Sequence, residues 1–476
     1  MHHTQLYING EWRDASDGST APVYNPADES VLAEVATATE EDVAAALDAA
    51  DGAFADWAAR KPRERAEILR RAFDIMSGQR EEIARLITLE NGKASADAMG
   101  EATYATEFFR WFSEEAVRID GHMGHSPASG ARTLVHHKPA GIGVLVTPWN
   151  FPAAMGTRKI APALAAGCPV IIKPALETPL TMLALMPILE EAGVPPGVVN
   201  VLMTRRSGPA VSQMLHDHRA RVVSFTGSTQ VGRILLKEAA DNVITPAMEL
   251  GGNAPFIVCK DADIPAAVEG AMVAKMRNMG EACTAANRIY VHESVEEEFT
   301  AALTKAMEAL RVGNGLEPGV DVGPLVNAAT RDKVAEFVKD AVARGAKVHC
   351  GGEAPEGPGF FYPPTVLSGV PTEAACMHDE IFGPVAAIQA FADEEEVVRL
   401  ANATEYGLVA YVFTQDMAKG LRISERLDYG MVGLNRGLVS DPAAPFGGTK
   451  QSGLGREGGH AGIFEFMETQ YISTNW

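Results

Sequence analysis

Cys283 and Glu249 are the residues of this 476-residue chain whose side chains most directly suggest chemistry. A thiol attacks carbon only as the thiolate, and a free thiol has a pKa of about 8.5. Chemistry near neutral pH therefore needs a base or a positive field, for which Glu249 and the flanking Arg277 and Arg288 are candidates. The glycines at 251 and 252 suit a carboxylate held at the edge of a tight site. Without Glu249 and the flanking arginines, Cys283 would be typical of a small buried apolar residue.

Asn150 lies in Pro148-Trp149-Asn150-Phe151-Pro152, where an expected strand ends and a helix begins. Asparagine at such a place predicts a helix cap, and Pro152 suits the first turn of the helix. A carboxamide at a strand end could also stabilise an oxyanion, together with the backbone N–H of Cys283. Both interpretations stay open at this point.

Two segments could bind phosphate or ribose. Gly227 and Ser228 run from a strand into a helix and resemble a phosphate-binding turn, because N–H groups at a helix start attract anions. Lys173 follows another strand, from which its amine could reach a ribose or phosphate. The literal G-x-G-x-x-G at residues 453–458 is a decoy, since no strand precedes it and too little chain follows for a βαβ unit. Glu380, taken alone, is typical of a surface carboxylate.

The composition excludes some classes of function. The chain is 46% hydrophobic and 22% charged, which is typical of a globular protein, and its length predicts about three domains. Its formal charge of −21 repels nucleic acid and anionic membranes, so neither is an expected partner. Its five cysteines are scattered without C-x-x-C spacing, so neither a disulfide framework nor a metal site is indicated. The start of the chain lacks a targeting pattern and no apolar stretch is long enough for a bilayer, which predicts a cytoplasmic protein.

The elements that must position these residues follow two sequence patterns, a helical one near the start of the chain and an alternation of strands and helices after it. Residues 6–13 predict a hairpin around Asn9-Gly10, and residues 41–59 and 62–77 predict amphipathic helices of a structural kind. Short apolar runs at 143–147, 169–173, 198–202 and 222–225 alternate with helical segments, which predicts a parallel sheet covered on both faces. Because ligands bind outside the carboxyl ends of such strands, Asn150, Lys173 and Gly227 should face one crevice.

A second αβ series runs from about Glu249 to Arg436. Residues 132–138 and 468–473 fit neither series and predict strands that project from the sheets. An unpaired strand edge seeks a partner, so we expect a homodimer or homotetramer interface there.

The motifs together resemble the NAD(P)-dependent aldehyde dehydrogenase superfamily. They occur in order across nearly the whole chain: Pro148-Trp149-Asn150, Lys173-Pro174, Phe225-Thr226-Gly227-Ser228, Glu249-Leu250-Gly251-Gly252, Cys283, Glu380-Ile381-Phe382-Gly383-Pro384, Pro445-Phe446-Gly447-Gly448 and Gly453-Leu454-Gly455-Arg456-Glu457. The resemblance implies an α/β fold with a Rossmann-like cofactor domain, an α/β catalytic domain and a small β oligomerisation arm. The expected boundaries are 1–122 and 141–248 for the cofactor domain, 249–436 for the catalytic domain, 123–140 and 455–476 for the arm, and 437–454 for a substrate-site loop that returns to the cofactor domain.

The resemblance also implies a role for each residue. Cys283 would attack an aldehyde to form a thiohemiacetal and then a thioester, with the oxyanion held by Asn150 and the Cys283 N–H and the thioester hydrolysed by water that Glu249 activates. Glu457 is implied as an aid to proton transfer, although on its own it reads as a surface residue. The cofactor residues implied are Thr147, Pro148, Trp149, Lys173, Gly227, Ser228, Glu380 and Phe382.

Within the superfamily, the chain is most similar to the succinate-semialdehyde dehydrogenases, through residues 149–159, residues 251–258 and Arg277-Asn278. This similarity implies that Arg158 and Arg277, with Ser440, bind the distal carboxylate of the substrate, because guanidinium groups offer paired donors. The alternatives are the same oxidation of glutarate semialdehyde or an aromatic aldehyde, and, from another class, a cysteine esterase without nicotinamide chemistry. A CoA-acylating enzyme is disfavoured because Glu249 supplies a hydrolytic base.

Three positions depart from the superfamily pattern. Glu281 stands where relatives usually carry Gln, and its charge would raise the pKa of Cys283 or select a different aldehyde. Ala285 leaves no neighbouring cysteine for a disulfide with Cys283. Leu176 stands where many NAD-preferring members carry Glu, which together with Arg205-Arg206 favours NADP slightly, while Glu177 keeps NAD open.

Overall fold

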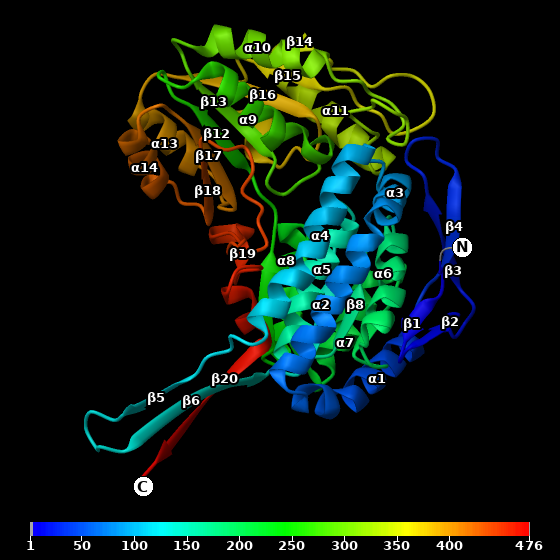
Figure 1. Ribbon diagram of the computed structural model, residues 1–476. Helices are drawn as coiled ribbons and strands as arrows, with labels where there is room; N and C mark the ends of the chain where they lie inside the picture. Colours follow the sequence, from blue (N-terminus) through cyan, green and yellow to red (C-terminus); the bar gives the residue numbers. More distant parts are fainter. Residues whose placement is uncertain (1–2, 476) are drawn as a thin grey trace.

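Figure 1 shows the computed structural model, which describes residues 3–475. Met1 and His2, in the predicted range 1–122, and Trp476, in the predicted range 455–476, lie outside the described residues. Between residues 3 and 475 the strands form sheets of eight, seven, three and two strands, with helices packed around the two large ones. The α/β fold class predicted from the sequence is confirmed.

The predicted N-terminal hairpin is present. Asn9 and Gly10 adopt φ angles of 56° and 77°, as a two-residue turn requires. Tyr7 of the first hairpin strand pairs with Val201, and the second hairpin strand forms the edge of the large sheet. The two helices expected after it begin and end within one residue of the predicted positions. The elements of this region are β1 (Leu6–Ile8), β2 (Glu11–Arg13), β3 (Thr20–Tyr24), β4 (Val31–Ala36), α1 (Glu40–Ala59), α2 (Pro62–Gly78), α3 (Arg80–Asn91) and α4 (Ser95–Glu115).

The eight-stranded sheet has the parallel centre that the apolar runs predict. Its order is β19-β11-β10-β7-β8-β9-β1-β2, and the strands from β11 to β9 are parallel. Lys173, the last residue of β8, pairs with Val146 of β7, so the carboxyl ends of these strands meet at one edge. The elements are β7 (Ile142–Val146), α5 (Pro152–Ala166), β8 (Val170–Lys173), α6 (Pro179–Ala192), β9 (Val199–Val201), α7 (Ser207–His216), β10 (Ala220–Thr226), α8 (Thr229–Asp241), β11 (Thr245–Glu249) and β19 (Gly453–Leu454).

The seven-stranded sheet contains the second αβ series. Glu249 ends β11 of the first sheet, so the second sheet starts a few residues later than the sequence suggested, at Ala254. Its order is β14-β15-β16-β13-β12-β17-β18. The elements are β12 (Ala254–Val258), α9 (Ile264–Met276), η1 (Arg277–Gly280), β13 (Ala286–His292), α10 (Glu296–Glu308), α11 (Ala328–Ala343), β14 (Lys347–Cys350), β15 (Thr365–Ser368), α12 (Ala375–His378), β16 (Val385–Phe391), α13 (Glu394–Asn402), β17 (Val409–Phe413), α14 (Met417–Arg426) and β18 (Met431–Leu434).

The predicted projecting strands form an arm that extends away from the sheets in Figure 1. β20 (Met467–Thr474) pairs antiparallel with β6 (Arg132–Pro139), which pairs in turn with β5 (His122–His125). The remaining elements, η2 (Lys450–Ser452) and η3 (Ala461–Phe466), lead into the arm.

Each large sheet has its own apolar core. One cluster surrounds β7, β8 and α5, and the other surrounds β12, β13 and β17. Ala282 and Ala285, which flank Cys283, belong to the first cluster although the following strand, β13, belongs to the second. The cysteine loop therefore lies at the junction of the two cores. Across residues 3–475, we find no helix with the length and apolarity that a membrane span needs.

Candidate active site

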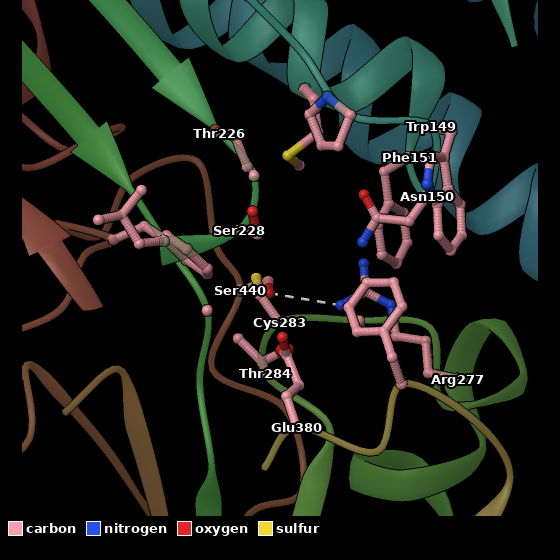
Figure 2. Close-up of a pocket in the computed structure, with 18 of the residues that line it drawn as sticks. Trp149, Asn150, Phe151, Thr226, Ser228, Arg277, Cys283, Thr284, Glu380 and Ser440 are labelled. Carbon is pink, nitrogen blue, oxygen red and sulfur yellow. Dashed lines mark hydrogen bonds between the residues drawn. The ribbon is translucent and has the colours of Figure 1, made fainter. Parts of the chain in front are cut away.

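A pocket of about 380 Å³ lies at this junction, beside the carboxyl ends of β7 and β10 (Figure 2). Thr147, Lys173 and Glu249 lie outside its lining. The lining brings together eleven of the residues predicted from the sequence: Pro148, Trp149, Asn150, Arg158, Gly227, Ser228, Arg277, Cys283, Glu380, Phe382 and Ser440.

The backbone before Cys283 is tightly constrained. Asn278, Met279 and Gly280 have φ angles of 53°, 54° and 78°, a left-handed run that only glycine adopts without steric cost. A Cβ on Gly280 would lie 2.2 Å from the carbonyl oxygen of Gly383. The Asn278 carboxamide holds the turn by donating to the carbonyl oxygens of Asn150 and Glu281, at 2.9 Å each. These contacts fix the loop against the segment that carries Asn150.

The environment of Cys283 raises the pKa of its thiol. Burial is the largest cause and moves the pKa to about 12, while the charges of Arg158 and Arg277 lower it. Glu249 and Glu380 raise it further. Of the two flanking arginines proposed from the sequence, Arg277 acts on the thiol. Arg288 is buried elsewhere and donates to the carbonyl oxygens of Asn253 and Ala401.

Asn150 does not cap α5, so that prediction is wrong. The N-cap residue is Phe151, and no side chain caps the helix. Asn150 instead donates from Nδ2 to the carbonyl oxygen of Glu281, at 2.9 Å, in the loop that carries Cys283. The backbone carbonyl oxygen of Asn150 accepts a hydrogen bond from Lys93 Nζ at 2.7 Å. A carboxamide has two N–H groups, so one remains for a ligand in the pocket.

Glu249 ends β11, and both its carboxyl oxygens are buried without a hydrogen-bond partner in the described chain. Burial is the main reason that its pKa lies well above 4.5, and Glu457 adds to this effect. Arg158 and Lys159 oppose the shift without cancelling it. The carboxyl group therefore holds its proton to a higher pH than an exposed glutamate does.

Glu457 is buried, so the interpretation as a surface residue is wrong. Its carboxylate contacts both Arg158 and Lys159, which keep its pKa low against the effect of burial. Lys159 Nζ also donates to Ser224 at 2.9 Å. The sequence hint that could have located this network is the pair of adjacent cations at 158 and 159 on one helix.

The end of the pocket that contains Arg277 and Ser440 is positively charged. Arg277 donates to Ser440 Oγ at 3.3 Å, the contact drawn as a dashed line in Figure 2, and its guanidinium lies 4.8 Å from the ring centroid of Phe151. Arg158 lies 4.3 Å from the ring centroid of Phe446 and is already paired with Glu457. The two arginines therefore reach the same pocket, but Arg158 reaches it as half of an ion pair.

Six of the cofactor residues expected from the sequence line the pocket, while Thr147 and Lys173 lie outside its lining. Ser228 caps α8 by accepting from the N–H of Val231, and the rings of Trp149 and Phe382 meet edge to face at 5.3 Å. Glu380 is partly buried rather than a surface carboxylate, and burial raises its pKa to about 7. Lys173 is buried and donates to Ser207 at 3.2 Å, and burial lowers its pKa to about 8. Thr147 lies next to Lys173, whose carbonyl oxygen accepts its N–H at 3.2 Å.

Sequence reasoning missed residues that lie in and just before α4. Tyr104 of α4 lines the pocket, and Lys93, just before α4, holds the Asn150 carbonyl. Lys93 also pairs with Glu101 at 2.5 Å, with both side chains fully buried. No local pattern distinguishes these residues from ordinary helix residues, because only the packing of α4 against α5 brings them to the site.

The fold and the pocket define an α/β protein with a cysteine nucleophile candidate at the junction of two sheets. The sequence matches the aldehyde dehydrogenase family over residues 12–472, and the chain belongs to that family.

Its relatives include enzymes with named substrates. The chain is 53% identical to a succinate-semialdehyde dehydrogenase of Paenarthrobacter nicotinovorans, over 93% of this chain and 98% of that protein. It is 47% identical to a glutarate-semialdehyde dehydrogenase of Pseudomonas putida, over 99% of this chain and 98% of that protein. The crystal structure of an NADP-dependent enzyme of Escherichia coli is 45% identical and superposes with a TM-score of 0.98, covering 100% of this chain and 98% of that one.

Proposed function

We propose that this protein oxidises a short aldehyde that carries a carboxylate, namely succinate semialdehyde, to the acid, with NADP or NAD as the oxidant. One observation carries the proposal: a single pocket holds a thiol, Cys283, a carboxamide, Asn150, and a cationic end formed by Arg277 and Ser440. Relatives named for succinate and glutarate semialdehyde, at 53% and 47% identity, support this substrate class.

Each residue has a distinct task in this reaction. Cys283 gives its thiol proton to Glu249, which passes it to solvent, and the thiolate attacks the carbonyl carbon. The resulting oxyanion accepts hydrogen bonds from the free N–H of Asn150 and the Cys283 backbone. A nicotinamide cofactor held in this pocket would supply the hydride acceptor through which the Cys283 adduct becomes a thioester. Glu249 then removes a proton from water, which hydrolyses the Cys283 thioester to the acid and frees the thiol. The raised pKa of Glu249 makes it a stronger base than an exposed carboxylate.

The residues expected to hold the cofactor fit a dinucleotide. Gly227 and Ser228 precede the first turn of α8, whose N–H groups attract a pyrophosphate. Lys173 and Glu380 are assigned to the riboses, Thr147, Pro148 and Trp149 to the wall beside them, and Phe382 to the nicotinamide ribose.

The surroundings of Lys173 favour NADP. Leu176 is an apolar side chain, so it does not repel a 2′-phosphate, and Arg205 and Arg206 are exposed just before Ser207, the partner of Lys173. Glu177 is exposed and would repel the same phosphate, so NAD is the alternative cofactor and is compared with NADP in the experiment.

The two separate apolar cores support the assignment of a different function to each domain. We assign cofactor binding to residues 1–122 and 141–248, the nucleophile loop to 249–436, and subunit contacts to the arm at 123–140 and 455–476, with 437–454 closing the substrate end of the pocket.

Steady-state kinetics test the proposal. Succinate semialdehyde, glutarate semialdehyde, benzaldehyde and butanal are compared with each cofactor through the absorbance of reduced nicotinamide. We expect the highest kcat/KM with succinate semialdehyde and NADP.

The Arg277→Ala variant should lose about 100-fold in kcat/KM for the semialdehydes and little for butanal, because a charged hydrogen-bond donor is lost. Arg63→Ala, an exposed position of α2, is the control. Unchanged turnover in both Arg277→Ala and Arg158→Ala would show that the substrate assignment is wrong, and an aldehyde-independent esterase would give no reduced nicotinamide.

A further inference from the structure

Tyr104 presents an unused hydrogen-bond donor to the active-site pocket. It lies on α4 and lines the pocket, and its hydroxyl oxygen is buried with no hydrogen-bond partner among residues 3–475. Native proteins rarely leave a buried hydroxyl unpaired, because its lost contact with water is then not replaced. The unpaired hydroxyl of Tyr104 thus indicates a ligand.

The charges around this hydroxyl show what kind of ligand it fits. Burial raises the pKa of Tyr104, and Arg158 and Arg277 lower it without reversing the shift, so the phenol keeps its proton near neutral pH. Arg158 acts through its charge and through its N–H groups, which lie near the hydroxyl oxygen without the geometry of a full hydrogen bond. An arginine side chain has donors but no acceptor, so it cannot take the proton of the phenol. The hydroxyl hydrogen therefore lacks an acceptor, and an anion would supply one.

The position of Tyr104 matches the cationic end of the pocket. The guanidinium of Arg277 lies 5.8 Å from the centroid of the Tyr104 ring. Tyr104, Arg277 and Ser440 line both the active-site pocket and an adjoining cavity of about 470 Å³, so these three residues stand where the two cavities meet. The Tyr104 ring packs edge to face on Phe108 at 4.9 Å, which limits its movement. The donor is thus held in place before a ligand arrives.

We propose that the Tyr104 hydroxyl donates a hydrogen bond to the distal carboxylate of the semialdehyde, beside Arg277 and Ser440, and thereby selects charged over uncharged aldehydes. This inference rests on the proposed function, because it needs a substrate with a distal carboxylate. Arg277 supplies the positive charge, while Tyr104 supplies a neutral donor whose direction is fixed by its ring. Arg158, already paired with Glu457, contributes less of its charge to the ligand.

The Tyr104→Phe variant tests this inference, because it removes the oxygen and keeps the ring. We expect kcat/KM for succinate semialdehyde to fall about tenfold or more, mainly through KM, since a bond to a charged group is lost from substrate binding. Butanal, which has no carboxylate, should change less than about twofold. Inhibition by succinate should weaken in parallel. Because the hydroxyl is unpaired in the protein itself, Tm should not fall. Tyr24→Phe removes a phenol hydroxyl from a half-exposed ring of β3 and serves as the matched control.

Four outcomes separate the possibilities. A selective loss with semialdehyde in Tyr104→Phe, at unchanged Tm, supports the inference. If the wild type prefers semialdehydes and Tyr104→Phe keeps that preference, the Tyr104 assignment is wrong and the proposed function stands. If the wild type itself shows no preference for carboxylate-bearing aldehydes, the proposed function fails and the Tyr104 assignment fails with it. An equal loss with butanal, or a lower Tm, would assign the hydroxyl a structural role and overturn the inference.

Discussion

Burial dominates the chemistry of Cys283 at the scale of single residues. The positive field expected from the sequence exists, since Arg158 and Arg277 both lower the pKa of the thiol, but desolvation outweighs them and moves it to about 12. Glu249 and Glu380 add to the rise. The thiol is therefore protonated near neutral pH in this structure, and alkylation by iodoacetamide should become faster as pH rises, because only the thiolate reacts.

Replacement of Cys283 by serine should abolish aldehyde oxidation. A serine hydroxyl is a far weaker nucleophile at neutral pH, so kcat should fall by about 1000-fold or more, while Tm stays close to that of the wild type. Reduced nicotinamide formation measures the first effect and thermal unfolding the second. Cys350→Ser, at a partly buried thiol of β14, is the matched control and should retain activity. Oxidation by Cys283→Ser at the parent rate would contradict a thioester route.

Glu281 behaves differently from the expectation that its charge would raise the pKa of Cys283. Its side chain is fully buried, and burial raises its own pKa well above 4.5, although the N–H of Val326 donates to it at 3.1 Å and Lys93 lies nearby. Burial thus favours the protonated, uncharged form of this carboxyl, which weakens its repulsion of the thiol. Burial therefore moves Glu281 toward the uncharged character of a glutamine.

Glu281→Gln should therefore keep kcat/KM within about twofold and should stabilise the protein as pH rises. The folded carboxyl holds its proton above pH 4.5, where the unfolded one has lost it, so stability is full below that pH and falls as pH rises toward the folded pKa. The loss is about 1.4 kcal/mol per pH unit, and glutamine does not suffer it. Thermal unfolding of both proteins between about pH 5 and pH 8 measures this difference. A Tm difference independent of pH would refute a neutral Glu281.

At the scale of elements, the left-handed run from Asn278 to Gly280 determines where Cys283 lies. It ends α9, turns the chain back, and is locked by Asn278 against the loop after β7. Ala282 and Ala285 then pack into the core of the first sheet. The loop that carries the nucleophile is thus bonded to both halves of the molecule.

Gly280→Ala should damage this loop beyond the cost of its backbone angle. The new Cβ would lie 2.2 Å from the Gly383 oxygen, so the loop must move, and we expect kcat to fall about tenfold or more because the nucleophile is displaced. Gly345→Ala is a matched control, since Gly345 has a φ of 105° but no atom within 4 Å of the added Cβ. Both variants should lose stability, as seen by thermal unfolding, and only Gly280→Ala should lose kcat. Equal activities would argue against a fixed loop.

At the scale of the whole molecule, the arm has an open edge. β20 pairs with β6 on one side only, and most of its residues are exposed, including Tyr471 at 57% and Ile472 at 43%. An exposed edge strand with apolar side chains favours association with another copy of the chain. The proposed homodimer or homotetramer would cover it.

Ile472→Asp should therefore lower the molar mass of the particle in solution. A charge placed in an apolar interface loses its hydration, which weakens association. Size-exclusion chromatography with light scattering measures the mass. Met417→Asp, at a 59% exposed position of α14 far from the arm, is the control and should keep the wild-type mass. A monomeric wild type, or an Ile472→Asp variant of unchanged mass, would rule out this role for the arm.

The sequence by itself determined the local elements and the kinds of chemistry. Apolar runs and Asn-Gly predicted strands and a hairpin that the structure confirms within a residue or two, because local patterns and turn residues act over short distances. The types and order of Asn150, Glu249 and Cys283 indicated the family.

Only the tertiary structure decided which groups meet and in which protonation state. The burial of Glu457, the turn of Asn150 away from the helix cap, and the position of Tyr104 all depend on the packing of α4, α5 and the cysteine loop. A pKa shift depends on desolvation and on neighbours distant in sequence, which no local pattern records. This is why the sequence overestimated the charge of Glu281 and missed Tyr104.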